Sequence, residues 1–290
     1  MKKVGFIGFG EVASVLSKRL IENGCSEISV FDILISEQEG IEKLRKRAQT
    51  DKITFASVED TIEKSDYILS TVTTQVAGKV AKECAKYLKQ GNTYIDLNST
   101  SPSVKVDISK IIIPTRADFV EGAILGAIGA TGADTKILLG GEYTSKVSSA
   151  LNAMGLNTSC FSSEIGKAST FKMLRSIYSK GMEALLLELL IAGKRAGLDK
   201  ELWNDILELM DKTPFEKTAS NWVKTHVAAC ERRYYEMIQV VDTMQEIGAE
   251  PLITRGTLDV FKRSTKAGLN KKVKEKPNSI DEVLELMRDL

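Results

Sequence analysis

The stretch that decides the fold is "VGFIGFGEVASVLSKRL", residues 4–20. An apolar run of strand type leads into two glycines, Gly8 and Gly10, and then into a segment of helical period. Gly8 permits a tight turn, and Gly10 lets the backbone approach a pyrophosphate. An acidic residue, Asp32, ends the next β-rich run, where such folds bind ribose hydroxyls. The pattern predicts a dinucleotide site, and the alternative is a plain tight turn in which Asp32 caps a local element.

The predicted cofactor site extends over the loops that follow several strands. Asp32 would accept hydrogen bonds from ribose hydroxyls and repel a 2′-phosphate, so NAD is expected rather than NADP. The basic residues between 43 and 47 leave NADP as a less favoured alternative. Polar loops at 70–74 and 97–102 leave the ends of two further strands, where ligands of parallel sheets collect. The expected cofactor-binding residues are Gly8, Phe9, Gly10, Glu11, Val12, Asp32, Thr71, Val72, Thr73 and Asn98.

The order of the predicted elements indicates two domains. Up to residue 163, strand candidates alternate with amphipathic segments, which is typical of a parallel sheet wrapped by helices. The strand candidates are 3–8, 27–32, 52–56, 67–72, 93–98, 118–124 and 136–141. From residue 164 onward only helical patterns occur, near 164–197, 199–211, 215–223, 226–248, 251–263 and 279–289. We therefore predict an α/β fold, a Rossmann-type doubly wound parallel sheet over 1–163, followed by an all-α domain over 164–290.

Composition limits the classes of partner. The chain has 290 residues, of which 43% are hydrophobic and 27% charged, with a net charge of +1, so nucleic acid or an anionic membrane is not expected as a partner. Four scattered cysteines and a single histidine suggest neither a metal site nor a disulfide scaffold. The most apolar run, 184–193, is short and contains Glu188, so no membrane span is expected. We expect a cytoplasmic protein that acts on a small molecule.

In the long helical segment 164–190, Lys172 shares one side of the helix with small residues. At about 100° per residue, Ala168, Ser169 and Ser176 lie within about 60° of Lys172. Lys172 is either an ordinary solvated lysine or an amine that small neighbours hold in position to take part in a reaction. The other sides of the helix are apolar and would pack in the chain's own core or against a second copy in a homodimer; the residues concerned are Leu174, Ile177, Leu185, Leu186, Leu189 and Leu190.

Four motifs together resemble the β-hydroxyacid dehydrogenase superfamily, which includes 6-phosphogluconate and 3-hydroxyisobutyrate dehydrogenases. They are "GFIGFGEVAS" (5–14), "DLNSTSP" (96–102), "FVEGAILGA" (119–127) and "GKASTFKMLRS" (166–176). More narrowly, the chain resembles a little-characterised branch with a divergent helical C-terminal domain. The resemblance implies that Lys172 is the general acid/base, which takes the hydroxyl proton on oxidation and returns it on reduction. Small neighbours would leave room for the substrate above the amine.

The same comparison shows departures from the family pattern. Ala168 stands at the motif's second glycine, Ser176 at its asparagine, and Leu125 replaces a serine of the substrate loop. Catalytic roles are expected for Lys172 and Ser176. The resemblance implies substrate contacts from Ser99, Glu121 and Gly122, and a looser alignment adds His226, Arg233 and Tyr235.

The predicted function is hydride transfer between a nicotinamide cofactor and a small hydroxy acid or a related alcohol or carbonyl compound. Two alternatives stay open at this point. Imine reductases share the architecture but differ at the catalytic position, so the lysine at 172 favours the dehydrogenase. A dinucleotide-binding protein without turnover is the alternative from a different class.

Overall fold

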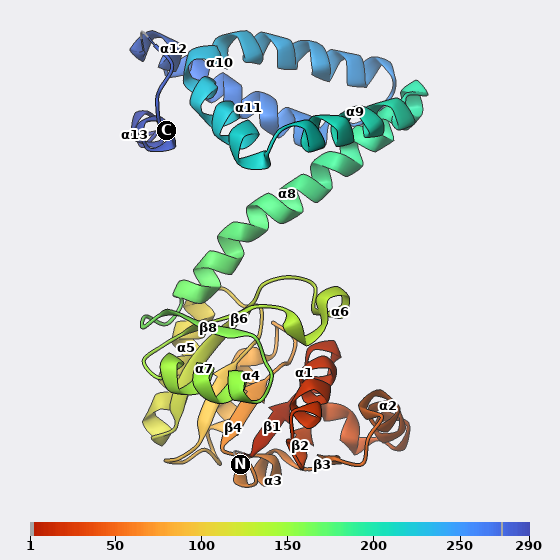
Figure 1. The fold of residues 1–290 in the computed structure, drawn as a ribbon, viewed down its shortest axis with the longest axis vertical. Coiled ribbons are helices and arrows are strands. Elements are labelled where there is room, and N and C mark those ends of the chain that lie inside the picture. The colour runs from red at the N-terminus through yellow and green to blue at the C-terminus, as the bar shows by residue number, and fades with distance from the viewer. Residues whose placement is uncertain (1–2, 274) are drawn as a thin grey trace. The chain divides into compact units, whose positions relative to one another are not determined.

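The computed structural model describes residues 3–273 and 275–290, and the chain divides into two compact units, Met1–Ser176 and Ile177–Leu290. All strands of the described chain lie in the first unit, and the second unit is helical (Figure 1). The division falls within helix α8 (Lys167–Ala196), whereas the sequence predicted a boundary before this helix, between residues 163 and 164. The beginning of α8, including Lys172, therefore belongs to the sheet-containing unit.

The first unit is built on one eight-stranded sheet with the order β3-β2-β1-β4-β5-β6-β7-β8. Neighbouring strands are parallel except for β6 and β7, which are antiparallel. The chain order reverses between β1 and β4, which are paired neighbours, and ligands of doubly wound sheets bind beyond the carboxyl ends of strands at such a point. The strands are β1 (Val4–Ile7), β2 (Ile28–Phe31), β3 (Ile53–Phe55), β4 (Tyr67–Ser70), β5 (Thr93–Asp96), β6 (Asp118–Ile124), β7 (Ile137–Gly140) and β8 (Thr158–Ser162).

The central strands are largely apolar because helices cover both faces of the sheet. Every residue of β1, β4, β5 and β7 is buried, as expected for parallel strands enclosed on two sides. The helices of this unit are α1 (Glu11–Glu22), α2 (Gln38–Ala48), α3 (Val58–Glu63), α4 (Ala77–Cys84), α5 (Pro102–Ile112), α6 (Ile128–Thr131) and α7 (Thr144–Ala153). In one core cluster, Leu16 and Leu20 of α1 pack on one face of the sheet. In the other, Ala81 of α4 and Ile108 of α5 pack on the opposite face.

The second unit consists of the rest of α8 and five further helices, α9 (Asp199–Lys212), α10 (Phe215–Glu246), α11 (Leu252–Lys266), α12 (Leu269–Lys272) and α13 (Ile280–Leu286). A small core of Val227, Cys230, Leu269 and Val283 holds the C-terminal helices to α10. Glu188 interrupts the apolar run of α8 for a structural reason. Its carboxylate accepts hydrogen bonds from the backbone N–H groups of Ile253 and Thr254, at 2.7 and 2.8 Å, and so caps α11.

The predicted fold class and the helical second half are confirmed. The seven predicted strands are present, and β8 was missed because its sequence, "TSCFS", is polar and lacks a β-branched apolar run. The two segments predicted at 215–223 and 226–248 form the single helix α10. Among the residues the structure describes, no helix is long and apolar enough to cross a membrane.

Candidate functional site

The loop between β1 and α1 turns at Gly8, whose φ is +91°. A Cβ atom on Gly8 would lie 2.8 Å from Val72 Cγ1 and 2.9 Å from the carbonyl oxygen of Thr71, so both the backbone conformation and the neighbouring loop require glycine. Thr71 Oγ1 also donates a 2.8 Å hydrogen bond to the Gly8 carbonyl. A Cβ on Gly10 would meet no atom within 4 Å, so the backbone there is open to a ligand.

Asp32 supports this loop and lines the cavity beside it. One carboxylate oxygen accepts a hydrogen bond from Phe9 N at 2.7 Å, and the other accepts from Leu34 N at 3.0 Å. Asp32 therefore caps a local element, the short helical turn Ile33–Ser36, as in the alternative that the sequence left open. Each carboxylate oxygen has a further lone pair, so ribose hydroxyls can still be bound. A basic side chain reaches the same loop, because Arg47 of α2 donates to the Phe9 carbonyl at 2.6 Å.

A cavity of about 480 Å³ opens beside the glycine loop. It is lined by Gly8, Phe9, Gly10, Phe31, Asp32, Ile33, Thr71, Val72, Thr73, Val76, Lys79, Val80 and Glu83. Much of this wall is apolar, which suits a flat ring such as adenine, and Asp32 adds a polar anchor at the end of β2. The cavity therefore lies where a doubly wound sheet binds the first half of a dinucleotide.

A second cavity, of about 330 Å³, adjoins the first, because Thr71, Val72 and Thr73 line both. Its other lining residues are Glu11, Val12, Thr74, Leu97, Asn98, Ser99, Ile124, Gly126, Ala127, Ile128 and Lys172. Every residue predicted to bind the cofactor lies in one of these two cavities. The second cavity also brings together Ser99 and Lys172, which are 73 positions apart in the chain.

Asn98 provides a direct test of whether this cavity fits a nicotinamide. Its Nδ2 donates to Ser70 Oγ at 3.0 Å and to Asp96 Oδ1 at 2.6 Å, which fixes the orientation of the amide. Its Oδ1 is buried and has no hydrogen-bond partner. Such an acceptor favours a ligand that carries an N–H donor, as the carboxamide of nicotinamide does. Together with the open backbone at Gly10, this acceptor fits a nicotinamide dinucleotide.

Lys172 lies half-buried in the second cavity, and its Nζ donates a hydrogen bond to Ser99 Oγ at 2.5 Å. Burial lowers the pKa of Lys172 to about 8, and the positive charge of Lys105 acts in the same direction. An amine with this pKa can exchange a proton at physiological pH far more readily than a solvated lysine. The arrangement therefore places a proton acceptor beside a hydroxyl, in the cavity next to the glycine loop.

Lys105 of α5 is a second lysine near the site, and its side chain is fully enclosed. Its Nζ donates to the backbone carbonyl of Asp96 at 2.8 Å and lies 3.2 Å from Asp96 Oδ1. Burial lowers the pKa of Lys105, and the negative charge of Asp96 opposes this effect. The sequence analysis missed this residue. The available signal was its spacing from Ile108 and Ile112, which places it on the apolar face of α5.

Glu121 does not have the predicted role as a substrate contact. It is fully buried in β6, and its carboxylate accepts hydrogen bonds from Gly166 N at 2.6 Å, Ala168 N at 3.1 Å and Ser169 Oγ at 2.6 Å. These donors form the start of α8, where unpaired N–H groups and the helix dipole favour a negative charge. Glu121 thus attaches the start of α8 to the sheet through residues that lie three to six positions before Lys172.

The small residues beside Lys172 also differ from expectation. Ala168 is completely buried and Ser169 is 2% exposed, so they do not leave space for a substrate above the amine. Ala168 instead packs with Ala123 of β6 and Leu138 of β7. Small side chains at these positions allow the helix to approach the sheet closely, and this approach brings Ser169 within hydrogen-bond distance of Glu121.

Two further predicted residues also make contacts within the protein. Ser176 Oγ donates to the backbone carbonyl of Lys172 at 2.9 Å, along its own helix. Gly122 is buried in β6, and a Cβ there would lie 2.4 Å from Leu97 Cδ2, so this glycine serves packing against the loop after β5. Neither residue lines the described cavities.

The remaining predicted substrate contacts lie in the second unit. His226 Nε2 is 2.9 Å from Ser264 Oγ, and its ring packs on Phe261 with centroids 5.2 Å apart. Burial lowers the pKa of His226, and the charge of Arg233 adds to this effect. His226 and Arg233 line an apolar groove of about 530 Å³, whereas Tyr235 is 61% exposed. Their role in binding a substrate stays a prediction.

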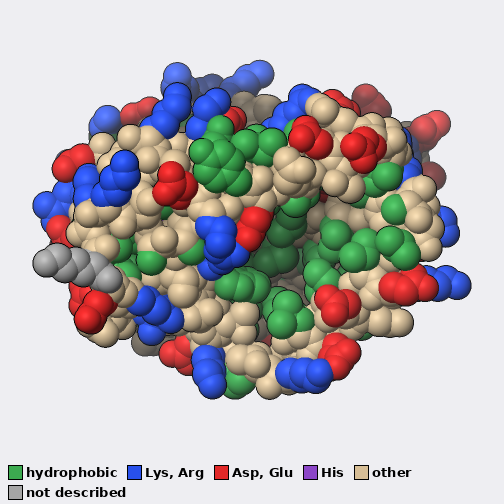
Figure 2. Space-filling model, turned by 90° about the horizontal axis from the view of Figure 1, so that it is seen from above, with side chains coloured by type: hydrophobic (Ala, Val, Ile, Leu, Met, Phe, Trp, Pro, Cys, Tyr) green, Lys and Arg blue, Asp and Glu red, His purple; other side chains and the backbone are tan. Residues whose placement is uncertain are grey.

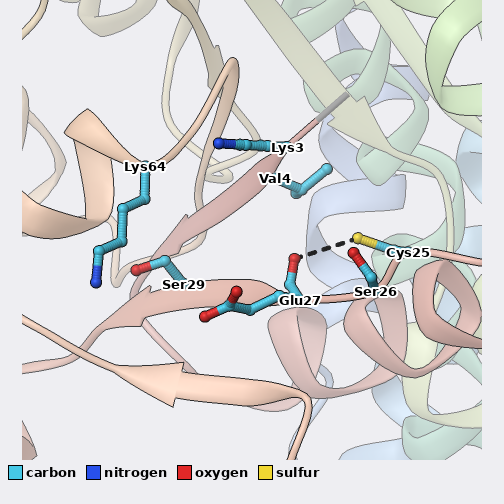
Figure 3. Close-up of a pocket in the computed structure, with 7 residues that line it drawn as sticks. All are labelled: Lys3, Val4, Cys25, Ser26, Glu27, Ser29 and Lys64. Atoms are coloured by element: carbon cyan, nitrogen blue, oxygen red, sulfur yellow. Dashed lines mark hydrogen bonds between the residues drawn. The ribbon is translucent and has the colours of Figure 1, made fainter. Parts of the chain in front are cut away.

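Another cavity, of about 410 Å³, lies at the amino ends of β1 and β2 (Figure 3). It is lined by Lys3, Val4, Cys25, Ser26, Glu27, Ser29 and Lys64, and Cys25 Sγ donates to the Glu27 carbonyl at 3.4 Å. Ligands of parallel sheets bind at the carboxyl ends of the strands. This cavity is at the opposite edge and is not part of the candidate site.

Comparisons with known proteins place this geometry in a family. Residues 3–100 match the family described as NADP oxidoreductase, coenzyme F420-dependent, and residues 194–264 match a domain of unknown function (DUF1932). An uncharacterised 28.5 kDa protein of Methanothermus fervidus is 32% identical over 260 residues, 90% of this chain and 98% of that protein. A solved structure of a conserved protein of unknown function, described as similar to 3-hydroxyacid dehydrogenases, is 33% identical, covers 92% of this chain and 98% of its own, and has a TM-score of 0.60. The chain belongs to the β-hydroxyacid dehydrogenase superfamily.

Two more distant matches follow, one to an enzyme by sequence and one to a solved structure by fold. Rat mitochondrial 3-hydroxyisobutyrate dehydrogenase is 24% identical over 213 residues, which span 71% of this chain and 61% of the rat enzyme. The fold of an imine reductase from Myxococcus stipitatus in complex with NADP⁺ matches with a TM-score of 0.79 at 21% identity, over 99% of both chains. The chain is an oxidoreductase with a nicotinamide-cofactor-binding Rossmann domain, and the predicted resemblance is confirmed.

Proposed function

We propose that this chain transfers a hydride between a nicotinamide cofactor and a small hydroxy acid, or a related alcohol or carbonyl compound, with Lys172 as the general acid/base. The observation that carries the proposal is the 2.5 Å hydrogen bond between Lys172 Nζ and Ser99 Oγ in the cavity next to the glycine loop. A nicotinamide bound there would supply the acceptor or donor of the hydride. The protein must then supply proton transfer, orientation and a site shielded from water.

Lys172 performs the proton step in this proposal. On oxidation, its neutral amine takes the hydroxyl proton while the carbon loses a hydride and the carbonyl double bond forms; on reduction, the ammonium returns the proton. The lowered pKa of about 8 supports this role, because an appreciable fraction of the amine is neutral near pH 7 to 8. Ser99 accepts a hydrogen bond from Lys172, and its own hydroxyl proton is available for the substrate oxygen.

We propose NAD as the preferred cofactor. Asp32 lines the cavity in which the adenosine half would bind, and its carboxylate would accept from ribose hydroxyls and repel a 2′-phosphate. Arg47 is engaged with the Phe9 carbonyl, so its guanidinium is partly occupied. NADP is the alternative that a direct comparison of the two affinities would identify.

The substrate is expected to carry an apolar part next to its hydroxyl or carbonyl group. Leu97, Ile124 and Ile128 line the same cavity as Lys172, and Leu125 stands where the family pattern has serine. Among the lining residues that the structure describes in this cavity, Lys172 is the only cation. A substrate carboxylate would therefore need a basic group in addition to Lys172.

The test combines a substrate screen with a matched pair of variants. Hydroxy acids, polyols, aldehydes and cyclic imines are screened with NAD(H) and NADP(H), and turnover is read by nicotinamide absorbance. Lys172→Met should reduce kcat by at least about 10²-fold, the lower range for loss of a general acid/base, and leave NADH affinity near wild type. Lys167→Met is the control, because Lys167 lies in the same helix but is exposed and pairs with Glu164.

Retention of most of the activity by Lys172→Met would reject the proposed role of this lysine. Turnover of imines alone would favour the imine reductase alternative. NADH binding without turnover of any compound in the screen would favour the non-catalytic alternative.

We also propose that the protein is a homodimer that works in the cytoplasm. Helix α8 exposes Leu174, Ile177 and Leu185, which are 60%, 71% and 43% exposed in the single chain. Hydrophobic side chains also gather between charged ones on the surface in Figure 2. Surface of this kind favours a second copy of the chain as a partner. The described cysteines are unpaired, as is usual in a reducing compartment. Light scattering at micromolar concentration would reject the dimer by returning the mass of one chain.

A further inference from the structure

The buried pair of Lys105 and Asp96 calls for an explanation that stability does not provide. Both side chains are fully enclosed, and Lys105 Nζ lies 3.2 Å from Asp96 Oδ1. Removing two charges from water is costly, and apolar residues of similar size are often at least as stabilising as a buried ion pair. Lysine is almost never fully buried unless it has a partner. A pair of this kind next to a site therefore suggests a function in that site.

The pair is connected to Lys172 by a short series of hydrogen bonds. Asp96 Oδ1 accepts from the backbone N–H of Asn98 at 3.0 Å and from its Nδ2 at 2.6 Å. These bonds hold the loop that follows β5. In this loop, Ser99 accepts the hydrogen bond from Lys172 at 2.5 Å. Lys105 thus stabilises the Asp96 carboxylate. This carboxylate orders the loop after β5, whose Ser99 accepts the hydrogen bond from Lys172.

Among the charged groups near Lys172, Lys105 is the one whose positive charge disfavours protonation of the Lys172 amine. Asp96 on β5 and Glu121 on β6 lie opposite each other in the sheet register. Asp96 Oδ1 is engaged by Asn98 and Lys105, whereas Asp96 Oδ2 is buried without a hydrogen-bond partner; Glu121 is engaged by donors at the start of α8. Glu11 of α1 lines the cavity at a more exposed position. Burial lowers the pKa of Lys172, and the positive charge of Lys105 lowers it further, because water screens the charge of an enclosed lysine poorly.

We propose that Lys105 is a positioning residue of the site, which holds Ser99 against Lys172 through Asp96 and favours the neutral, proton-accepting amine of Lys172. Lys105 itself touches neither substrate nor cofactor in this role. The inference rests on the proposed function, in which Lys172 exchanges a proton with the substrate. Its effect on the amine can nevertheless be measured without any substrate.

The experiment measures the protonation of Lys172 directly in the full-length protein. Acetic anhydride labels neutral amines, and mass spectrometry of the Lys172 peptide between about pH 6 and 11 gives the midpoint of labelling, a range that spans ordinary and lowered lysine pKa values. Lys105→Met should move this midpoint upward by about one pH unit, less than half of the difference between 10.5 and about 8, because burial is the larger of the two causes. Lys110→Gln is the matched control, because Lys110 is on the same helix but is exposed and paired with Asp107, and it should leave the midpoint unchanged.

A second variant covers the case in which Lys105→Met leaves Asp96 unpaired and unfolds the protein. The double substitution Lys105→Met with Asp96→Asn removes both charges and keeps an oxygen acceptor for Asn98. The inference requires an upward shift in this variant too. An unchanged midpoint in a folded variant overturns it, and so does a shift that occurs only in the single variant, because that shift would come from the unpaired charge of Asp96.

The outcome is separable from that of the proposed function. Activity that depends on Lys172, with no shift on loss of Lys105, would overturn this inference alone. A shift without any turnover would overturn the proposed function and leave the electrostatic role of Lys105 standing.

Discussion

Replacing Lys172 with methionine should make the protein more stable at neutral pH, although it removes the proposed acid/base. Burial and the charge of Lys105 lower the pKa of Lys172 from 10.5 to about 8. A pKa lowered in the folded state means that the protonated amine is less favourable there than in the unfolded chain. At about 1.36 kcal/mol per pKa unit, the penalty at neutral pH is at most about 3 kcal/mol, because solvent screens the exposed part of the amine, and the methionine variant does not bear this penalty.

The pH dependence gives the prediction its sign. Below a pH of about 8 the amine is protonated in both the folded and the unfolded state, so the wild type carries the full penalty. Between about 8 and 10.5 the folded state loses the proton first, so the wild type gains stability as pH rises, and above 10.5 the penalty is gone. The stability advantage of Lys172→Met should therefore be largest near neutral pH and shrink by at most about 3 kcal/mol towards pH 10.5.

The assay is urea denaturation followed by circular dichroism at several pH values, on the wild type, Lys172→Met and Lys167→Met. Groups that do not interact with Lys172 titrate equally in the wild type and the variants, so the difference reports Lys172 together with its interaction with Lys105. Lys167 is exposed, and its replacement should change stability by less than about 0.5 kcal/mol at every pH. A difference between wild type and Lys172→Met that stays constant with pH, or that grows above pH 8, would refute the burial penalty.

Three further predictions concern the attachment of α8 and the choice of cofactor. Glu121→Gln should lower the free energy of unfolding by about 2 kcal/mol, because hydrogen bonds to a buried charge from the start of α8 are weakened; a urea midpoint equal to wild type would contradict this. Gly166→Ala should cost about 1–3 kcal/mol by the same assay, because φ at this position is +97°. Gly181→Ala, in the middle of α8 with free space around it, is its control and should instead stabilise by about 0.5–1 kcal/mol. Asp32→Asn should change the ratio of NADH to NADPH affinity by about tenfold in favour of NADPH, and calorimetric titration that finds the ratio unchanged would remove Asp32 as its determinant.

Much of the cofactor half of the site could be predicted from the sequence, because its physics is local. Gly8, Gly10 and Asp32 follow strands at a spacing that fixes the strand–turn–helix unit, and the structure places them in one cavity. The strand order then brings the loops after β4 and β5 to the same edge, so Thr71 and Asn98 were also predictable. These positions depend on backbone geometry more than on side-chain packing.

The substrate half was predicted less well, because it depends on contacts between residues far apart in the chain. The angular position of Ala168 and Ser169 on their helix was correct, but helical period cannot say whether a small residue faces a ligand or the sheet. Only the packing of α8 on β6 shows that they serve close approach and that Glu121 caps the helix. The spacing of Lys105 from Ile108 and Ile112 indicates burial, but nothing in its local sequence reveals Asp96, the carboxylate that it pairs with.

The boundary between the two compact units has a consequence for how this superfamily member could diverge. It falls at Ser176, about one helical turn beyond Lys172, so the glycine loop, Asn98, Ser99 and Lys172 are all encoded upstream of it. The residues of the proposed hydride and proton steps thus form one inheritable module. Mutations in the helices beyond Ser176 can accumulate without changing any residue of this module, and chimaeras joined at this point offer a way to exchange the helical unit between relatives.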